Sequence, residues 1–254
     1  MFWLLVILMP LEVRGQIIGK PSTSSTPLEE DSDRAMNLIA KLSERLTTQD
    51  LNLRRIECQE EVSLERTARK GGETTRKTQR FLMSADRRQV GEFSIDMQLV
   101  ESHQPMESAT AIAPGDLVQD GFSVAVELWG LNHAEAYSQH VSPKEKLDGR
   151  EVYVVSSQTI KHAEPRRLII DGKAVPMRLF ARSWIDADNG TLLKMEIHQE
   201  KLPKNVREFY YDIRYAEPSA ATRGMILPQT IRFTRSDREA TSVVTQTFSG
   251  CRIN

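Results

Sequence analysis

The side chains best suited to metal or acid–base chemistry are the histidines, of which there are five. They are His103, His133, His140, His162 and His198. None of them sits in an HExxH motif or another tight metal-ligand spacing, so each is predicted to be a surface or strand residue. The sequence also lacks a Gly-x-Ser-x-Gly elbow, a phosphate-binding glycine loop and the ligands of a four-cysteine zinc site. We therefore expect that the protein binds no metal or cofactor and is not an enzyme. A catalytic triad that only the tertiary fold brings together stays open as an alternative.

The closely spaced carboxylates of Asp186-Ala187-Asp188-Asn189-Gly190 resemble part of a calcium loop. The EF-hand pattern requires Gly at its sixth position and Glu at its twelfth. Here Gly190 is fifth and Ile197 is twelfth, so the calcium interpretation fails. Asn189-Gly190 between two apolar-alternating segments instead predicts a hairpin turn with positive φ.

Charge gives little support for a nucleic-acid or membrane partner. Lys and Arg number 34 against 35 Asp and Glu, and the net charge is -1. Three arginine pairs, Arg54-Arg55, Arg87-Arg88 and Arg166-Arg167, could each hold a phosphate or carboxylate. Acidic residues near each pair favour ordinary solvated strand edges and turns.

The two cysteines, Cys58 and Cys251, each lie in a segment predicted to be a strand. In an oxidising compartment they could form one disulfide between the first and last strands, or they could stay as two buried thiols.

The N-terminus indicates export. Residues 1–10 are almost wholly apolar and Val13-Arg14-Gly15 follows, which predicts a signal peptide over 1–15 with cleavage before Gln16. The apolar segment is too short to span a bilayer as a helix. Residues 16–31 are rich in Ser, Thr and Pro and are predicted to be a linker. A periplasmic or secreted protein is expected.

A helix and many strands should follow. Asp31 or Ser32 is the predicted cap of a helix in which Met36, Leu38, Ile39, Leu42 and Leu46 recur at helical spacing, and which ends near Asp50. From residue 51 onward the apolar residues recur at every second position, as in strands. Turns are predicted at 70–73, 148–149, 171–172 and 189–190. Strands are predicted at 93–99, 151–156, 167–170, 177–186, 192–198, 209–215, 231–234 and 243–248, besides a long hairpin over 56–83. The section 103–147 is less regular, with a short helix over 122–131.

This pattern predicts an α+β, mainly β, fold: a strongly curved antiparallel sheet, or half-barrel, with an N-terminal amphipathic helix and short helices covering the concave face. Its alternating apolar side chains could line a cavity or fill a core. The candidate lining residues are Phe93, Ile95, Met97, Leu99, Phe180, Trp184, Leu193, Met195 and Ile197.

Several short sequence segments resemble those of LolA-like proteins, the outer-membrane lipoprotein carriers. They are especially similar to uncharacterised secreted members from acidobacteria. They are Trp184-Ile185-Asp186, Asn189-Gly190, 192–196, Leu202-Pro203, Leu227-Pro228, Ile56-Glu57-Cys58 and the C-terminal 248–252. The likeness covers residues 32–254. It implies a half-barrel wrapped around helices, with an apolar cavity for acyl chains. No lipoprotein-binding arginine of the family can be matched to a position here.

Two functions follow as hypotheses. The first is an exported, monomeric binding protein that holds a hydrophobic ligand, such as a lipid or a lipoprotein acyl chain, under the sheet. The alternative is an envelope sensor or scaffold that contacts another protein through a sheet edge or the 103–147 segment, with a solid core and an exposed apolar patch.

Overall fold

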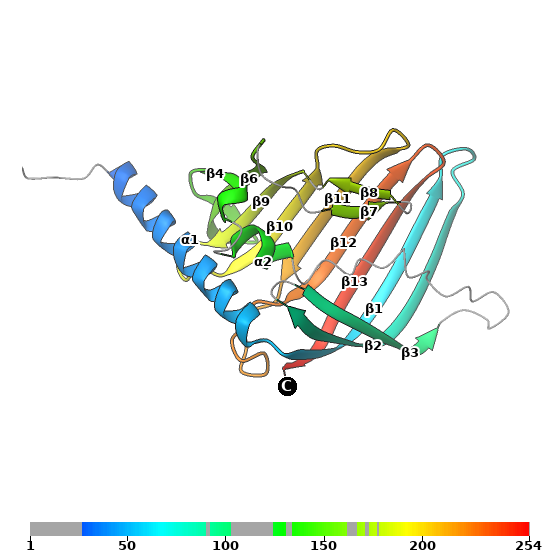
Figure 1. Ribbon diagram of the computed structural model, residues 1–254, viewed down its shortest axis with the longest axis horizontal. Helices are drawn as coiled ribbons and strands as arrows, with labels where there is room; N and C mark the ends of the chain where they lie inside the picture. Colours follow the sequence, from blue (N-terminus) through cyan, green and yellow to red (C-terminus); the bar gives the residue numbers. More distant parts are fainter. Residues whose placement is uncertain are drawn as a thin grey trace, which may run out of the picture.

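The protein is built around one curved, unclosed antiparallel sheet. The structure, a computed structural model, describes residues 27–89, 92–102, 124–130, 134–161, 167–170, 173–176 and 178–253. Within them, 11 strands form a sheet in the order β3-β2-β1-β13-β12-β11-β10-β9-β6-β4, with β5 paired to β6. Figure 1 shows the sheet bending around α2 while α1 crosses one end of it. The predicted mainly β fold with a curved antiparallel sheet is confirmed.

The elements have the following bounds. The helices are α1 (Pro27–Asn52), α2 (Val124–Trp129) and the 3₁₀ turn η3 (Ala134–Ala136). The strands are β1 (Arg55–Ala68), β2 (Thr74–Gln89), β3 (Glu92–Ser102), β4 (Tyr137–Val141), β5 (Glu145–Leu147), β6 (Arg150–Thr159), β9 (Leu179–Asp186), β10 (Leu192–Gln199), β11 (Val206–Tyr215), β12 (Pro228–Asp237) and β13 (Ala240–Ile253). A separate two-stranded sheet joins β7 (Arg167–Ile170) to β8 (Lys173–Pro176).

Most predicted strands are present and are longer than predicted. The turn over 70–73 joins β1 to β2 with positive φ at Gly71 and Gly72, where a side chain would be strained. The short helix predicted over 122–131 is α2. Three strands were missed, β4, β5 and β8. In β4 and β5 the described side chains are mostly exposed, so they carry no apolar alternation.

Helix α1 begins earlier than predicted. It starts at Pro27, a residue suited to the first helical turn, and not after a cap at Asp31 or Ser32. The last residues of the predicted linker, 27–31, are therefore helical, whereas the predicted signal peptide and residues 16–26 lie outside the described residues. The buried stripe of α1 consists of Ala35, Ile39, Leu42 and Leu46. Met36, predicted to belong to it, is 55% exposed.

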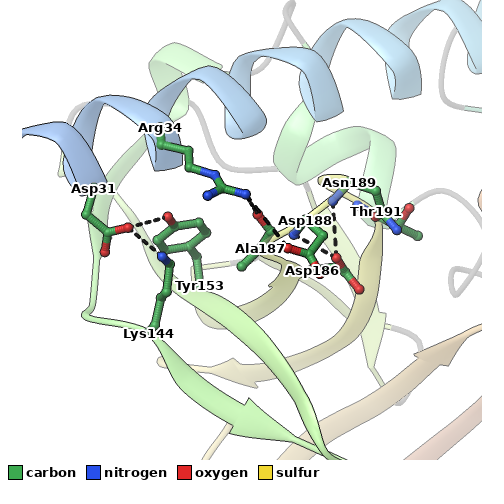
Figure 2. A network of polar contacts seen from close by, with 9 residues as sticks. All are labelled: Asp31, Arg34, Lys144, Tyr153, Asp186, Ala187, Asp188, Asn189 and Thr191. Carbon is green, nitrogen blue, oxygen red and sulfur yellow. Dashed lines mark hydrogen bonds and ion pairs between the residues drawn. The ribbon is translucent and has the colours of Figure 1, made fainter.

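The N-terminal half of α1 is held by a polar network (Figure 2). The Tyr153 hydroxyl donates to Asp31 Oδ1 at 2.8 Å, and Lys144 Nζ lies 2.6 Å from the same oxygen. The hydrogen bonds from Lys144 and Tyr153 hold the pKa of Asp31 below its usual value. One turn later, Arg34 donates to the Ala187 carbonyl at 3.1 Å. The helix is thereby tied to both β6 and the β9–β10 turn.

The β9–β10 turn, residues 186–191, packs directly against α1. Asp186 Oδ1 accepts from the backbone N–H groups of Asp188 and Asn189 at 2.9 and 3.2 Å. Gly190 has φ +72°, and a Cβ there would lie 3.2 Å from Leu38 Cδ2. The turn interpretation of Asn189-Gly190 is confirmed. Asp186 caps its own turn, and its other oxygen lies 3.7 Å from Arg150.

The C-terminal half of α1 is fixed by backbone contacts. The Gln49 side chain donates to the Ile226 carbonyl at 2.9 Å and accepts from the Ile226 N–H at 2.8 Å. Arg87 of β2 donates to the Leu51 carbonyl at 3.0 Å, where the helix ends. The N-terminal half of α1 is thus tied to β6 and the β9–β10 turn, and its C-terminal half to Ile226 and β2.

The two cysteines are bonded. Cys58 of β1 and Cys251 of β13 form a disulfide across 193 residues of sequence. The β1–β13 ladder shifts register between Glu57 and Gln59, so Cys58 lies at a β-bulge. The predicted disulfide is confirmed.

Candidate functional site

The sheet has two unlike sides, because side chains alternate along each strand. The side that packs against α1 and α2, here called the helix side, carries the main core. That core joins Ile39, Leu42 and Leu46 of α1, Leu128 and Trp129 of α2, and buried side chains from β1, β2, β6 and β9–β13. The other side carries a small separate cluster of Val152, Val154 and Trp184, with Leu147 and Leu193 packed against it.

Four of the predicted lining residues share the helix side. Met195 and Ile197 are fully buried in the main core, and Ile95 and Met97 are half-buried against it. Leu99 is 50% exposed on β3. The side chain of Phe93 lies outside the described part of the structure. The structure therefore brings Ile95 and Met97 of β3 to the same side of the sheet as Met195 and Ile197 of β10.

The prediction that Trp184 and Leu193 belong to the same lining is corrected. Trp184 packs on the opposite side, where its indole N–H donates to Glu145 at 2.7 Å. The cations of Arg182 and Lys194 each lie 4.9 Å from its ring centroid. Phe180 lies four residues before Trp184 on β9, so its side chain faces the same side of the sheet, where it is half-buried.

Beyond α1 and α2, the helix side carries a second apolar group, here called the β1–β13 cluster. Its members are Val62, Leu64, Phe81, Met97, Phe233 and Val244. Only Val62 and Val244 are buried, whereas the other four are half-buried. The ring of Phe233 also contacts Phe209 and Tyr211, with centroids 4.8 and 4.9 Å apart. Among the described residues, this surface keeps aromatic and thioether contact area that their own packing does not bury.

A buried carboxyl lies beside this cluster. Glu60 occupies an inward position of β1 between Cys58 of the main core and Val62 of the β1–β13 cluster, and is 2% exposed. Gln246 Nε2 of β13 donates to Glu60 Oε1 at 2.6 Å. Burial raises the pKa of Glu60 to about 7, against a smaller opposing effect of the Gln246 hydrogen bond.

Glu60 and Gln246 were not among the sequence candidates. A signal for Glu60 was nevertheless present, because it takes an apolar position in the period-two series Ile56, Cys58, Glu60, Val62. Gln246 stands in the same way between Val244 and Phe248. Charged or amide residues at inward strand positions should therefore be read as site candidates.

A hollow of about 390 Å³ lies between the C-terminal half of α1 and residues 223–225. Its lining includes the charged residues Lys41, Glu44, Arg45 and Arg223. Arg45 also donates to the Gly224 carbonyl. A lining of this polarity does not suit an acyl chain.

Most of the remaining polar candidates lie at the surface where the structure describes them, whereas Arg87 is half-buried and pairs with the buried Asp50 at 3.4 Å. His140 and His198 are exposed, and His198 stacks near Tyr210 with centroids 4.5 Å apart. His103, His133 and His162 lie outside the described residues. Arg55 pairs with Glu57 at 3.0 Å. Among the described residues, no three His, Cys, Asp or Glu side chains gather as metal ligands would, and no helix is long and apolar enough to cross a membrane.

Comparison with known proteins gives structural neighbours only. No family model and no curated protein matches the sequence. Among solved structures, a DUF1329 family protein from Desulfovibrio piger matches with a TM-score of 0.44 and 14% identity, over 87% of this chain and 93% of that one. A LolA superfamily protein from Nitrosomonas europaea gives 0.39 and 14%, with the same coverage.

A domain from Vibrio parahaemolyticus, named for outer membrane lipoprotein sorting, matches with a TM-score of 0.41 and 13% identity, over 85% and 92% of the two chains. These neighbours include the LolA superfamily, the group that the sequence phrases resemble.

Proposed function

We propose that this protein is an exported, monomeric binding protein that holds an apolar ligand, such as a lipid or an acyl chain, against the helix side of its curved sheet. The observation that carries the proposal is the β1–β13 cluster. Four of its six apolar side chains stay half-buried although they lie on the side that elsewhere forms the core. The ligand is held without chemical conversion.

The energetics suit such a ligand. Each methylene removed from water contributes about 0.8 kcal/mol, so ten buried methylenes supply about 8 kcal/mol toward binding, from which the cost of association is subtracted. Phe81, Phe233 and Met97 present flat rings and a flexible thioether, which adapt to a chain of varying shape. The ligand would lie alongside the helices, since the main core beneath α1 is filled by the protein's own side chains.

The test is displacement of a fluorescent fatty-acid probe, together with native mass spectrometry of protein purified from the periplasm. Phe233→Ala should weaken probe binding about tenfold, since it removes an aromatic contact of the cluster. Leu193→Ala is the matched control, because Leu193 is also half-buried and apolar but lies on the opposite side. Absence of co-purified lipid together with absence of probe binding, or equal loss in the two variants, would contradict the proposal.

The proposed export of the protein is tested by sequencing its mature N-terminus. Protein recovered from the periplasm should begin at Gln16 if residues 1–15 are the signal peptide. Recovery of the mature chain only from the cytoplasm would contradict this part of the proposal.

The alternative, a protein that acts through contact with another protein, is favoured by one observation. Edge strand β3 carries Leu99 and Val100, which are 50% and 69% exposed. Cross-linking from position 100 in cells should capture one defined partner under this alternative, and Val100→Lys should abolish that capture. Under the ligand-binding proposal, Val100→Lys leaves probe affinity unchanged.

A further inference from the structure

Glu60 and Gln246 sit at the boundary between two apolar clusters. On β1, Cys58 before Glu60 belongs to the main core, and Val62 after it belongs to the β1–β13 cluster. On β13, Gln246 stands in the same way between Val244 and Phe248. The two polar side chains meet across the ladder, with 2.6 Å between Gln246 Nε2 and Glu60 Oε1. A polar pair thus interrupts an otherwise apolar inner surface.

This pair has acceptor capacity left over. Gln246 is 4% exposed, and its Oε1 is buried without a hydrogen-bond partner. In the described part of the chain, Glu60 forms no ion pair, and its one described hydrogen bond uses Oε1. A buried carboxylate without a cation is costly, and an unmatched amide oxygen adds to that cost. At pH 8 the ionised Glu60 carboxylate and Gln246 Oε1 can only accept hydrogen bonds, so a partner that serves both must be a donor.

We propose that Glu60 and Gln246 form the polar anchor of the ligand site, and that they bind a hydrogen-bond donor, best a primary ammonium group, at the head of an otherwise apolar ligand. This inference rests on the proposed function, since the apolar part of the ligand would lie along the β1–β13 cluster. An ammonium group carries three donors and no acceptor, so it can serve Glu60 and Gln246 together. A hydroxyl group can donate to only one of them.

The anchor also determines which ligands the site excludes. A free fatty acid carries a carboxylate, which would face Glu60 and the amide oxygen of Gln246 with acceptors alone. Like charges in a buried site are strongly unfavourable. The site therefore selects chain amines over chain alcohols, and chain alcohols over fatty acids.

The experiment compares three ligands with the same twelve-carbon chain, each kept below its micelle concentration. Dodecylammonium, dodecanol and dodecanoate compete against N-phenyl-1-naphthylamine at pH 8. Dodecylammonium should bind at least tenfold tighter than dodecanoate. Glu60→Gln should abolish this preference, because it removes the charge while keeping the shape. The matched control is Glu61→Gln, which removes the same charge from an exposed neighbour paired with Arg80, and it should leave the preference intact.

A pH series of the unchanged protein provides a second measurement. Between pH 8 and 5.5 the ammonium stays charged while Glu60 takes up a proton, so the preference should fall severalfold. By register the side chains beside Glu60 on β2 and β13 are Phe81 and Phe248, which do not titrate. Charged residues on the same side of the sheet include Lys77 of β2 and Arg235 of β12.

The outcomes separate the two proposals. If no chain displaces the probe, the proposed function itself is wrong. If all three chains bind equally well, or if Glu60→Gln and Glu61→Gln behave alike, the chain site stands but the anchor does not. If dodecanoate binds most tightly, the assignment of donor and acceptor is reversed.

Discussion

Replacing Glu60 by Gln should stabilise the protein in alkaline solution and leave it nearly unchanged in acid. The pKa of Glu60 rises from an ordinary 4.5 to about 7 because the carboxyl is buried. The folded protein therefore keeps a proton that the unfolded chain releases, and its stability falls as pH rises from 4.5 to 7. Above pH 7 the loss is complete and amounts to about 3 kcal/mol.

The Gln side chain has the same shape and no charge. Its amide can still accept from Gln246 Nε2, and it can also donate to the unpartnered Gln246 Oε1. The difference in the free energy of unfolding between Glu60→Gln and the unchanged protein should therefore grow by about 2 to 3 kcal/mol between pH 5 and pH 8.

Urea denaturation followed by circular dichroism, with the disulfide intact, measures this difference. The midpoint of Glu60→Gln should exceed that of the unchanged protein by about 1 M urea at pH 8. Glu61→Gln is the control for loss of one negative charge, since Glu61 is exposed and paired with Arg80; its effect should stay below about 1 kcal/mol at both pH values. A difference that does not change with pH, or a Glu60→Gln protein that is less stable at pH 8, would refute the reasoning.

Three further predictions concern the stability of the fold that supports the site. Gly190→Ala should cost about 1 to 3 kcal/mol in urea denaturation, because its Cβ would meet Leu38 at 3.2 Å and the backbone has φ +72°; an unchanged midpoint would contradict the close packing. Reducing the bond between Cys58 and Cys251 should lower the free energy of unfolding by about 5 kcal/mol in the chain-entropy model, since 193 residues separate them; thermal melts with and without dithiothreitol test this. Gln49→Leu should cost about 2 kcal/mol by removing two buried hydrogen bonds, and Thr48→Ala is the neighbouring control, expected to be nearly neutral.

Much of the fold could be predicted from period and turn chemistry. The spacing of Ile39, Leu42 and Leu46 marks the buried stripe of α1, and Asn189-Gly190 marks the turn into β10. The positions of the two cysteines in the first and last predicted strands allowed a disulfide without requiring it, and the structure shows the bond. These signals are local, so a single sequence reveals them.

The side on which β9 and β10 present their side chains could not be predicted from hydrophobicity. On β9 the helix side holds the small residues Ala181 and Ser183, and Ser183 accepts a 3.1 Å hydrogen bond from Trp129 of α2. The large Trp184 faces the other way. On β10 a register shift between Leu192 and Lys194 reverses the parity, so Leu193 leaves the side that Met195 occupies. Both reversals depend on contacts with distant segments or on a bulge, which alternation alone does not reveal.

The position of β13 has a consequence for how the chain reaches its native state. It follows the other described strands in sequence, yet it is the only link between β1 and β12 in the described sheet. Until it inserts, the sheet consists of two arcs with no ladder between them, and neither arc can enclose a common interior. Such dependence on distant pairing makes folding slow and cooperative.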